Sequence, residues 1–149
     1  LVFDKTGTLT HGAAQVKFIG ALDDQELGWV KSLTSASTHP LSNLISRSIT
    51  RNSNLTIEHF QERPGLGLEG KLAGVSIKIG SAAFTGFNGD LNDTASKVFV
   101  SMDGQVRGYF KIETQIREQV REVVTHLGDQ CVALISGDQP VEADRMKSL

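Results

Sequence analysis

The sequence predicts an α+β fold in which an antiparallel sheet with a helical hairpin is inserted into an incomplete α/β domain. A short apolar strand opens the chain, runs of alternating polarity fill residues 55–111, and a strand, turn and helix pattern follows near the end. A period of two residues indicates strands, whereas apolar residues three and four apart indicate helices. Because the α/β pattern stops and later resumes, we expect residues 14–111 to form an inserted domain between pieces at 1–13 and 112–149.

The composition is typical of a water-soluble globular domain. Hydrophobic residues make up 39% of the 149 residues and charged residues 21%, both close to globular averages. Lys and Arg number 15 and Asp and Glu 17, so the net charge is −2 and no nucleic-acid partner is expected. The longest apolar runs have about five residues, far fewer than the roughly 20 that span a bilayer. The chain starts without methionine or a leader, so we expect a piece of a longer protein.

The opening residues are expected to form a strand that ends in an aspartate before a polar turn. Val2 and Phe3 are the apolar end of this strand, and Asp4 follows them. Lys5 adds positive charge, Thr6 adds a hydroxyl, and the glycine after them lets backbone N–H groups turn toward an anion. These residue types predict a phosphate site in which Asp4 can act as a nucleophile. A simple turn is the alternative.

Two helices are expected to follow a first strand at residues 14–20. Asp23 can cap the first helix, with Glu26 three positions on in a capping-box arrangement. Pro40 can begin the second helix at its first position. Each helix has an apolar stripe at helical spacing, formed by Leu27, Val30 and Leu33 in the first and by Leu41, Leu44, Ile45 and Ile49 in the second. The two helices are therefore expected to form a hairpin.

The middle of the chain is expected to form antiparallel hairpins. Alternating polarity predicts strands at residues 56–60, 68–72, 75–79, 97–102 and 106–112. Two-residue turn signals join two pairs of these strands, at Ala73-Gly74 and at Asp103-Gly104.

Two further features belong to this region. Residues 81–84 are expected to form a short helix, and residues 88–90 a loop. The glycines at 65, 67 and 70 have the spacing of a dinucleotide-binding turn. An alternating strand and not a helix follows them, so a hairpin turn is predicted instead.

An α/β pattern is expected to return near the end of the chain. Apolar residues return to helical spacing from Gln115, and Gly128 ends the predicted helix. Val132 to Ile135 predicts a buried strand, and Cys131 beside it is expected to be a small buried hydrophobe. A turn and a further helix are predicted after this strand.

Two motifs resemble those of a known family. Residues 4–10 read DKTGTLT, which resembles the phosphorylation motif of the P-type ATPases, the membrane cation pumps. Residues 37–41, with His39-Pro40-Leu41, resemble the Ser-Glu-His-Pro-Leu signature of the heavy-metal, or type IB, subgroup. In this family a nucleotide-binding domain is inserted into a Rossmann-like phosphorylation domain. The resemblance implies that layout for this chain.

The resemblance implies a phosphate side of the site. Asp4 would attack the γ-phosphate of ATP and become an aspartyl-phosphate. Lys5 and Thr6 would support this step, and Mg²⁺ would bridge the phosphate, the Asp4 carboxylate and the Thr6 carbonyl. Ser136 and Asp138 resemble the family's Thr-Gly-Asp motif. Ser136 would contact the transferred phosphoryl group, and Asp138 would shape the site.

The resemblance also implies which residues bind the nucleotide. The residues that it assigns to ATP binding are His39, Gly65, Gly67, Gly80 and Ser81. Three further positions, outside the motifs quoted above, depart from the family pattern. Thr34 replaces a glutamate, Ser81 an asparagine and Thr114 an aspartate.

The expected function is ATP binding and phosphorylation in a heavy-metal pump, with copper(I) expected as cargo ahead of zinc or cadmium. The parent would be an integral membrane protein, with this region on its cytoplasmic side and the metal ion held by membrane helices outside this sequence. A nucleotide-sensing module with a degenerate site is the alternative that the three departures favour. A haloacid-dehalogenase-like phosphatase is a third hypothesis. Those enzymes place an acid two residues after the nucleophile, where this chain has Thr6, so a pump is favoured.

Overall fold

The computed structural model describes four stretches of the chain, which are residues 2–4, 10–90, 95–116 and 133–135. Side chains are described within residues 14–90 and 95–113. The chain divides into two compact units, the larger formed by residues 16–91 and 96–112, and the smaller by residues 1–15, 92–95 and 113–149. The domain boundaries expected after residues 13 and 111 stay a prediction.

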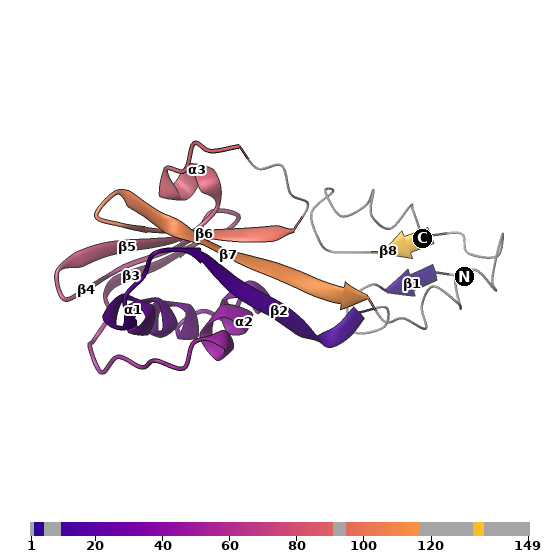
Figure 1. Cartoon of the computed structure of the whole chain (residues 1–149), viewed down its shortest axis with the longest axis horizontal. Helices are drawn as coiled ribbons and strands as arrows, with labels where there is room; N and C mark the ends of the chain where they lie inside the picture. The colour runs from indigo at the N-terminus through magenta and orange to yellow at the C-terminus, as the bar shows by residue number, and fades with distance from the viewer. Residues whose placement is uncertain (1, 5–9, 91–94, 117–132, 136–149) are drawn as a thin grey trace. The chain divides into compact units, whose positions relative to one another are not determined.

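The larger unit is built on a six-stranded antiparallel sheet (Figure 1). The order across the sheet is β2-β7-β6-β5-β4-β3. Its strands are β2 Thr10–Gly20, β3 Glu58–Arg63, β4 Gly67–Leu72, β5 Val75–Gly80, β6 Ser96–Met102 and β7 Gln105–Ile116. The predicted antiparallel sheet is therefore confirmed.

Both predicted two-residue turns are present. Ala73 and Gly74 have φ of 50° and 79°, and Asp103 and Gly104 have φ of 49° and 79°. Two successive residues with positive φ match the twist of antiparallel strands, which is why such turns favour glycine and aspartate. The two hairpins are also joined, because the Ser76 N–H donates to Asp103 Oδ1 at 2.9 Å and the Asp103 N–H donates to the Ser76 carbonyl at 2.8 Å.

Three helices accompany the sheet, α1 Asp24–Ser35, α2 Pro40–Ser48 and α3 Ala82–Thr85. The capping box at the start of α1 is formed as predicted. The Glu26 N–H donates to Asp23 Oδ1 at 2.7 Å, and the Asp23 N–H donates to Glu26 Oε2 at 3.0 Å. Pro40 is the first residue of α2, and α1 packs against α2 as the predicted hairpin.

The core lies on both faces of the sheet. Figure 1 shows α1 and α2 on one side and α3 on the other. Five consecutive residues of β6, from Val98 to Met102, are buried. Because neighbouring residues of a strand point to opposite faces, this run requires cover on each side. On the hairpin side, Gly70 of β4 leaves room for α1, since a Cβ there would lie 2.8 Å from Leu33 Cδ1.

The bounds of β2 and β3 differ from the sequence predictions. β2 begins at Thr10, whereas the strand was predicted at residues 14–20. β3 begins at Glu58 and runs to Arg63, later than the predicted 56–60, and its register with β4 shifts between Glu58 and Gln61. His59 has a φ of 53° at this irregularity. A bulge of this kind inserts an extra residue and breaks the two-residue period, which misplaced the predicted strand.

The helix predicted from Gln115 is wrong at its start, because β7 continues to Ile116. Pairing of β7 with the eleven-residue β2 gives the backbone of this segment hydrogen-bond partners in the extended form. Tertiary pairing therefore overrides the local helical spacing. The rest of that helix and the helix expected after Pro140 lie outside the described residues, as does Cys131.

In the smaller unit, two short strands lie side by side. β1 Val2–Asp4 and β8 Ala133–Ile135 pair in parallel, with Asp4 opposite Ile135. The strands predicted at both positions are confirmed. None of the helices in the described ranges has the length and apolar character needed to cross a bilayer.

Candidate functional site

His39 connects the two helices of the hairpin and caps the second one. Its backbone is extended, with φ −62° and ψ 136°, and its Nδ1 accepts a hydrogen bond of 3.2 Å from the Leu41 N–H. Nδ1 must be unprotonated to accept this bond, so the proton of the neutral ring lies on Nε2. His39 is exposed. The residue therefore presents one ring N–H donor to solvent.

A buried serine, Ser37, binds the backbone of His39 through a hydrogen bond. The His39 N–H donates to Ser37 Oγ at 3.1 Å, and Ser37 Oγ donates to Glu62 Oε1 of β3 at 3.1 Å. Ser37 is 3% exposed. These contacts join the loop between α1 and α2 to the strand that leads into the glycine turn at residue 65. The contact between Ser37 and Glu62 was not predicted, because no local sequence pattern pairs residues 25 positions apart.

Gly65 lies in the open turn between β3 and β4. Its φ is 74°, and a Cβ there would meet no atom within 4 Å. An ion pair closes the base of the turn, with Arg63 Nη2 2.6 Å and Arg63 Nε 2.7 Å from Glu69 Oε1. The backbone at Gly65 is thus accessible to a ligand on a turn whose two strands are tied together.

The close approach of β4 and β5 requires glycine at positions 67 and 80. They are directly paired in the β4–β5 ladder. A Cβ on Gly67 would lie 2.7 Å from Gly80 Cα and would overlap the Ile79 carbonyl, and a Cβ on Gly80 would lie 2.7 Å from Gly67 Cα. Both glycines are therefore needed for the approach of two strands, whether or not a ligand also approaches this backbone.

Ser81 begins the short helix α3 as its N-cap. Its Oγ accepts from the Phe84 N–H at 3.3 Å. One lone pair of this hydroxyl is thus used within the chain, and its proton is the group that it can offer to a ligand. Serine and asparagine are similarly good N-caps, which explains how a serine fits at this position.

Thr34 faces the protein interior. It is fully buried, and its Oγ1 donates to the Val30 carbonyl at 2.9 Å and to the Lys31 carbonyl at 3.1 Å. The residue therefore does not share the exposed surface of His39. Thr114 lies in β7, beyond the last residue whose side chain is described.

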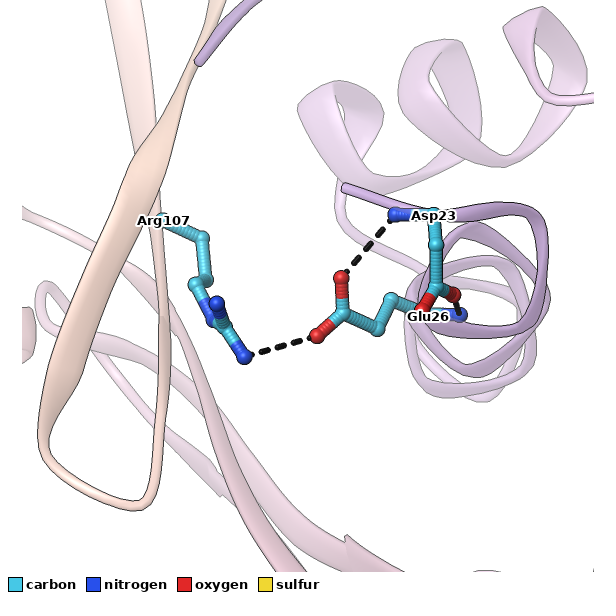
Figure 2. Close-up of polar contacts among 3 residues, drawn as sticks. All are labelled: Asp23, Glu26 and Arg107. Atoms are coloured by element: carbon cyan, nitrogen blue, oxygen red, sulfur yellow. Dashed lines mark hydrogen bonds and ion pairs between the residues drawn. The ribbon is translucent and has the colours of Figure 1, made fainter. Parts of the chain in front are cut away.

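An ion pair anchors the start of α1 to the sheet (Figure 2). Arg107 Nη2 of β7 lies 2.8 Å from Glu26 Oε1, while Glu26 Oε2 accepts the Asp23 N–H of the capping box. One carboxylate thus caps the helix and fixes it to a strand 81 residues away in sequence. This contact holds the helix that leads toward His39.

At the predicted phosphate site, the structure describes the backbone at the carboxyl ends of β1 and β8. Asp4 ends β1 and Ile135 ends β8, and the two are paired. Because β1 and β8 are parallel, their carboxyl ends are neighbours, and ligands of α/β sheets bind outside such ends. Lys5, Thr6, Ser136 and Asp138 lie outside the described residues, as does the side chain of Asp4. Within the part of the chain that is described, no group of three or more His, Cys, Asp or Glu side chains could hold a metal ion.

Comparison with known proteins identifies the family. The family model of haloacid dehalogenase-like hydrolases matches residues 1–148, so the chain belongs to this family.

Among the proteins similar to this chain are metal-transporting P-type ATPases. The chain is 30% identical over 162 residues to the copper-exporting P-type ATPase of Mycobacterium tuberculosis, covering 96% of the chain and 21% of that protein. It is 31% identical over 160 residues to the zinc-transporting ATPase of Bacillus subtilis, covering 93% of the chain and 25% of that protein. The chain thus spans about a quarter or less of these relatives. The solved catalytic CPx-ATPase domain CopB-B matches 99% of the chain and 55% of that domain, with a TM-score of 0.67 and 25% identity.

Proposed function

We propose that this chain is the ATP-binding and phosphorylation region of a heavy-metal-transporting P-type ATPase. The observation that carries the proposal is the parallel pairing of Asp4 with Ile135. The DKTGTLT motif begins at the end of β1, and the Ser-Gly-Asp motif directly follows the neighbouring end of β8. Two segments that the family resemblance assigns to one phosphate site thus leave from adjacent strand ends.

The proposed reaction is phosphoryl transfer to Asp4 in the full-length parent. A carboxylate oxygen of Asp4 forms a bond to the γ-phosphorus of ATP, the bond to the β,γ-bridging oxygen breaks, and ADP leaves. Lys5 and Thr6 stabilise the charge of the transferred group, with Ser136 as a hydrogen-bond donor and Asp138 shaping the site. The Asp4 carboxylate and the Thr6 carbonyl would hold Mg²⁺, which would supply charge neutralisation. Water then hydrolyses the aspartyl-phosphate.

The nucleotide side is proposed to include five residues of the larger unit. His39 offers its Nε2–H donor, Gly65 an open backbone and Ser81 its hydroxyl proton. Gly67 and Gly80 bring the backbone of β4 and β5 to the nucleotide. Relatives named as ATPases support a nucleotide as the ligand of this surface.

The proposal extends to the parent protein. Residues 14–111 form the nucleotide-binding domain, inserted in a Rossmann-like phosphorylation domain to which residues 1–13 and 112–149 belong. The region lies on the cytoplasmic side of an integral membrane pump. Copper(I) is the proposed cargo, supported by a copper-exporting relative, and zinc is the alternative that a zinc-transporting relative supports. The measurement that separates them is stimulation of ATP hydrolysis in the purified parent by each ion.

Titration calorimetry of the 149-residue chain with ATP tests the nucleotide site. His39→Asn is the sharpest variant, because an Asn side chain is a good N-cap acceptor but lacks the Nε2–H donor. We expect the wild-type chain to bind ATP and His39→Asn to bind about tenfold more weakly, as for one lost hydrogen bond at the upper end of the usual range. The melting temperature should not change. Equal affinity in the two proteins would remove His39 from the site.

A nucleotide-sensing module without catalysis is the second candidate. The buried position of Thr34 favours it, because the residue that stands in place of the family's glutamate has no exposed polar group. The two functions differ in the full-length parent. A sensing module binds ATP without forming a phosphoenzyme, whereas a pump forms one.

A further inference from the structure

Ser37 is the central residue of a hydrogen-bond relay that ends at His39. Its single hydroxyl donates to Glu62 Oε1 and accepts from the His39 N–H, both at 3.1 Å. Ser37 lies in the connection between α1 and α2 and is buried, with 3% of its surface exposed. One side chain thus connects a carboxylate of the sheet edge to the backbone of the residue that caps α2.

The chemistry of the three groups fixes the direction of this relay. An ionised carboxylate can only accept hydrogen bonds, so the one proton of the Ser37 hydroxyl must point to Glu62. A lone pair of Ser37 Oγ is then left for the His39 N–H. Without Glu62, the same hydroxyl could rotate and donate elsewhere, and the acceptor for the His39 N–H would no longer be held in place.

The hydrogen bonds of His39 leave one ring nitrogen for a ligand. The main-chain N–H of His39 is bound by Ser37, and ring Nδ1 is bound by the Leu41 N–H. With the backbone and one ring nitrogen held, Nε2 is the ring nitrogen left for a ligand. The orientation of this donor therefore depends on the buried Ser37 and, through it, on Glu62 of β3.

We propose that Ser37 and Glu62 are positioning residues of the nucleotide site, where their hydrogen bonds hold His39 in the orientation that directs Nε2–H to ATP. This inference rests on the proposed function. It adds a serine inside the helical hairpin and an acid on β3 to a site whose other members contact the nucleotide. Their effect is on affinity through His39, without contact with ATP.

The test uses the 149-residue chain and five variants, with ATP affinity from calorimetry and melting temperature measured for each. Ser37→Ala removes both hydrogen bonds, and Glu62→Ala removes the acceptor that orients the hydroxyl. Glu62→Gln keeps an acceptor oxygen. Ser32→Ala is the matched control, because Ser32 Oγ donates to the Gly28 carbonyl within α1 at 3.1 Å. The fifth variant combines Ser37→Ala with Glu62→Ala.

We expect Ser37→Ala and Glu62→Ala each to weaken ATP binding about two- to tenfold, the range of one net hydrogen bond. The double variant should bind no more weakly than Ser37→Ala, because both changes break one relay. Glu62→Gln and Ser32→Ala should bind like the wild type. Wild-type affinity in both Ser37→Ala and Glu62→Ala would overturn the inference, and so would single effects that multiply in the double variant.

Nitrogen NMR of the His39 ring separates failure of this inference from failure of the proposed function. Ring nitrogen shifts report which nitrogen carries the proton, and the Ser37→Ala shifts should move toward a mixture of tautomers. If the wild-type chain binds no ATP, the proposed function fails and the positioning role falls with it. If the wild type binds ATP but the ring signals and the affinity of Ser37→Ala are unchanged, only the relay is wrong.

Discussion

Gly67 and Gly80 face each other across the β4–β5 ladder so closely that neither position has room for a Cβ. A Cβ on either would lie 2.7 Å from the Cα of the other. The same arrangement occurs between β2 and β7, where a Cβ on Gly108 would lie 2.8 Å from Gly20 Cα. The φ values also agree, 148° at Gly67 and 144° at Gly108. Among the described residues, two glycine pairs thus allow neighbouring strands to approach closely, and one of them belongs to the proposed nucleotide site.

The Gly20–Gly108 pair serves as a control for the Gly67–Gly80 pair. Gly67→Ala and Gly108→Ala should each lower the free energy of unfolding by about 1–3 kcal/mol, because the added methyl group must displace backbone. Only Gly67→Ala should also weaken ATP binding by the folded protein. Urea unfolding and calorimetry below the unfolding transition measure the two effects. If Gly108→Ala weakens ATP binding equally, the glycine pair at 67 and 80 acts through the fold alone.

The Arg107–Glu26 ion pair is expected to stabilise the larger unit more than an exposed pair on the same helix. Glu26 is 14% exposed, and its carboxylate serves both Arg107 and the cap of α1. Glu26→Ala should therefore lower the free energy of unfolding by about 1–2 kcal/mol. The control is Arg51→Ala, because Arg51 and Asp24 are 58% and 71% exposed and such pairs contribute about 0–1 kcal/mol. Equal effects of the two substitutions would contradict this ranking.

Ala73 is the residue of the β4–β5 turn that fits its conformation least well. Its φ of 50° is one that asparagine adopts more readily than alanine. Ala73→Asn should raise the free energy of unfolding by about 0.5–1 kcal/mol, a typical gain for a compatible turn residue. Thermal unfolding measures the change. Ala83→Asn, on an exposed position of α3, is the comparison, and a gain there as large as at residue 73 would show that the turn is not its source.

Ser81→Asn is expected to tighten ATP binding without disturbing α3. Asparagine caps helices about as well as serine, so the bond from the Phe84 N–H should be kept. Its amide adds two N–H donors where serine has one hydroxyl proton. Ser81→Asp, which caps equally well but adds no donor, is the matched control. Calorimetry should show tighter binding for the asparagine variant alone, and equal affinity in wild type and Ser81→Asn would remove Ser81 from the site.

Features set by local chemistry were predictable from the sequence. The capping box of α1 and the turns at residues 73–74 and 103–104 were predicted, because each depends on residue types a few positions apart. The bulge at His59 was missed, because a single histidine in a run of alternating polarity does not by itself predict a positive φ. The extension of β7 to Ile116 was missed as well, because it depends on pairing with β2.

The residues of the candidate site were likewise predictable only where the signal is local. His39 was predicted as a residue before a proline-started helix, and the structure adds that its own Nδ1 caps that helix. Ser37 was seen only as the first residue of the motif at residues 37–41, and its contact with Glu62 was not predictable because the two residues lie 25 positions apart. The roles of Asp4 and the other phosphate-side residues stay predictions.

Phosphorylation of the full-length parent tests the central claim most directly. The purified pump is incubated with Mg²⁺ and ATP labelled at the γ-phosphate, and the acid-quenched protein is treated with hydroxylamine, which cleaves acyl-phosphates. We expect label that hydroxylamine removes, located on the peptide containing Asp4, and no label in Asp4→Asn, whose amide is not a nucleophile of this kind. Hydroxylamine-sensitive label that persists in a folded, ATP-binding Asp4→Asn protein would contradict the assignment of Asp4 as the phosphorylated residue.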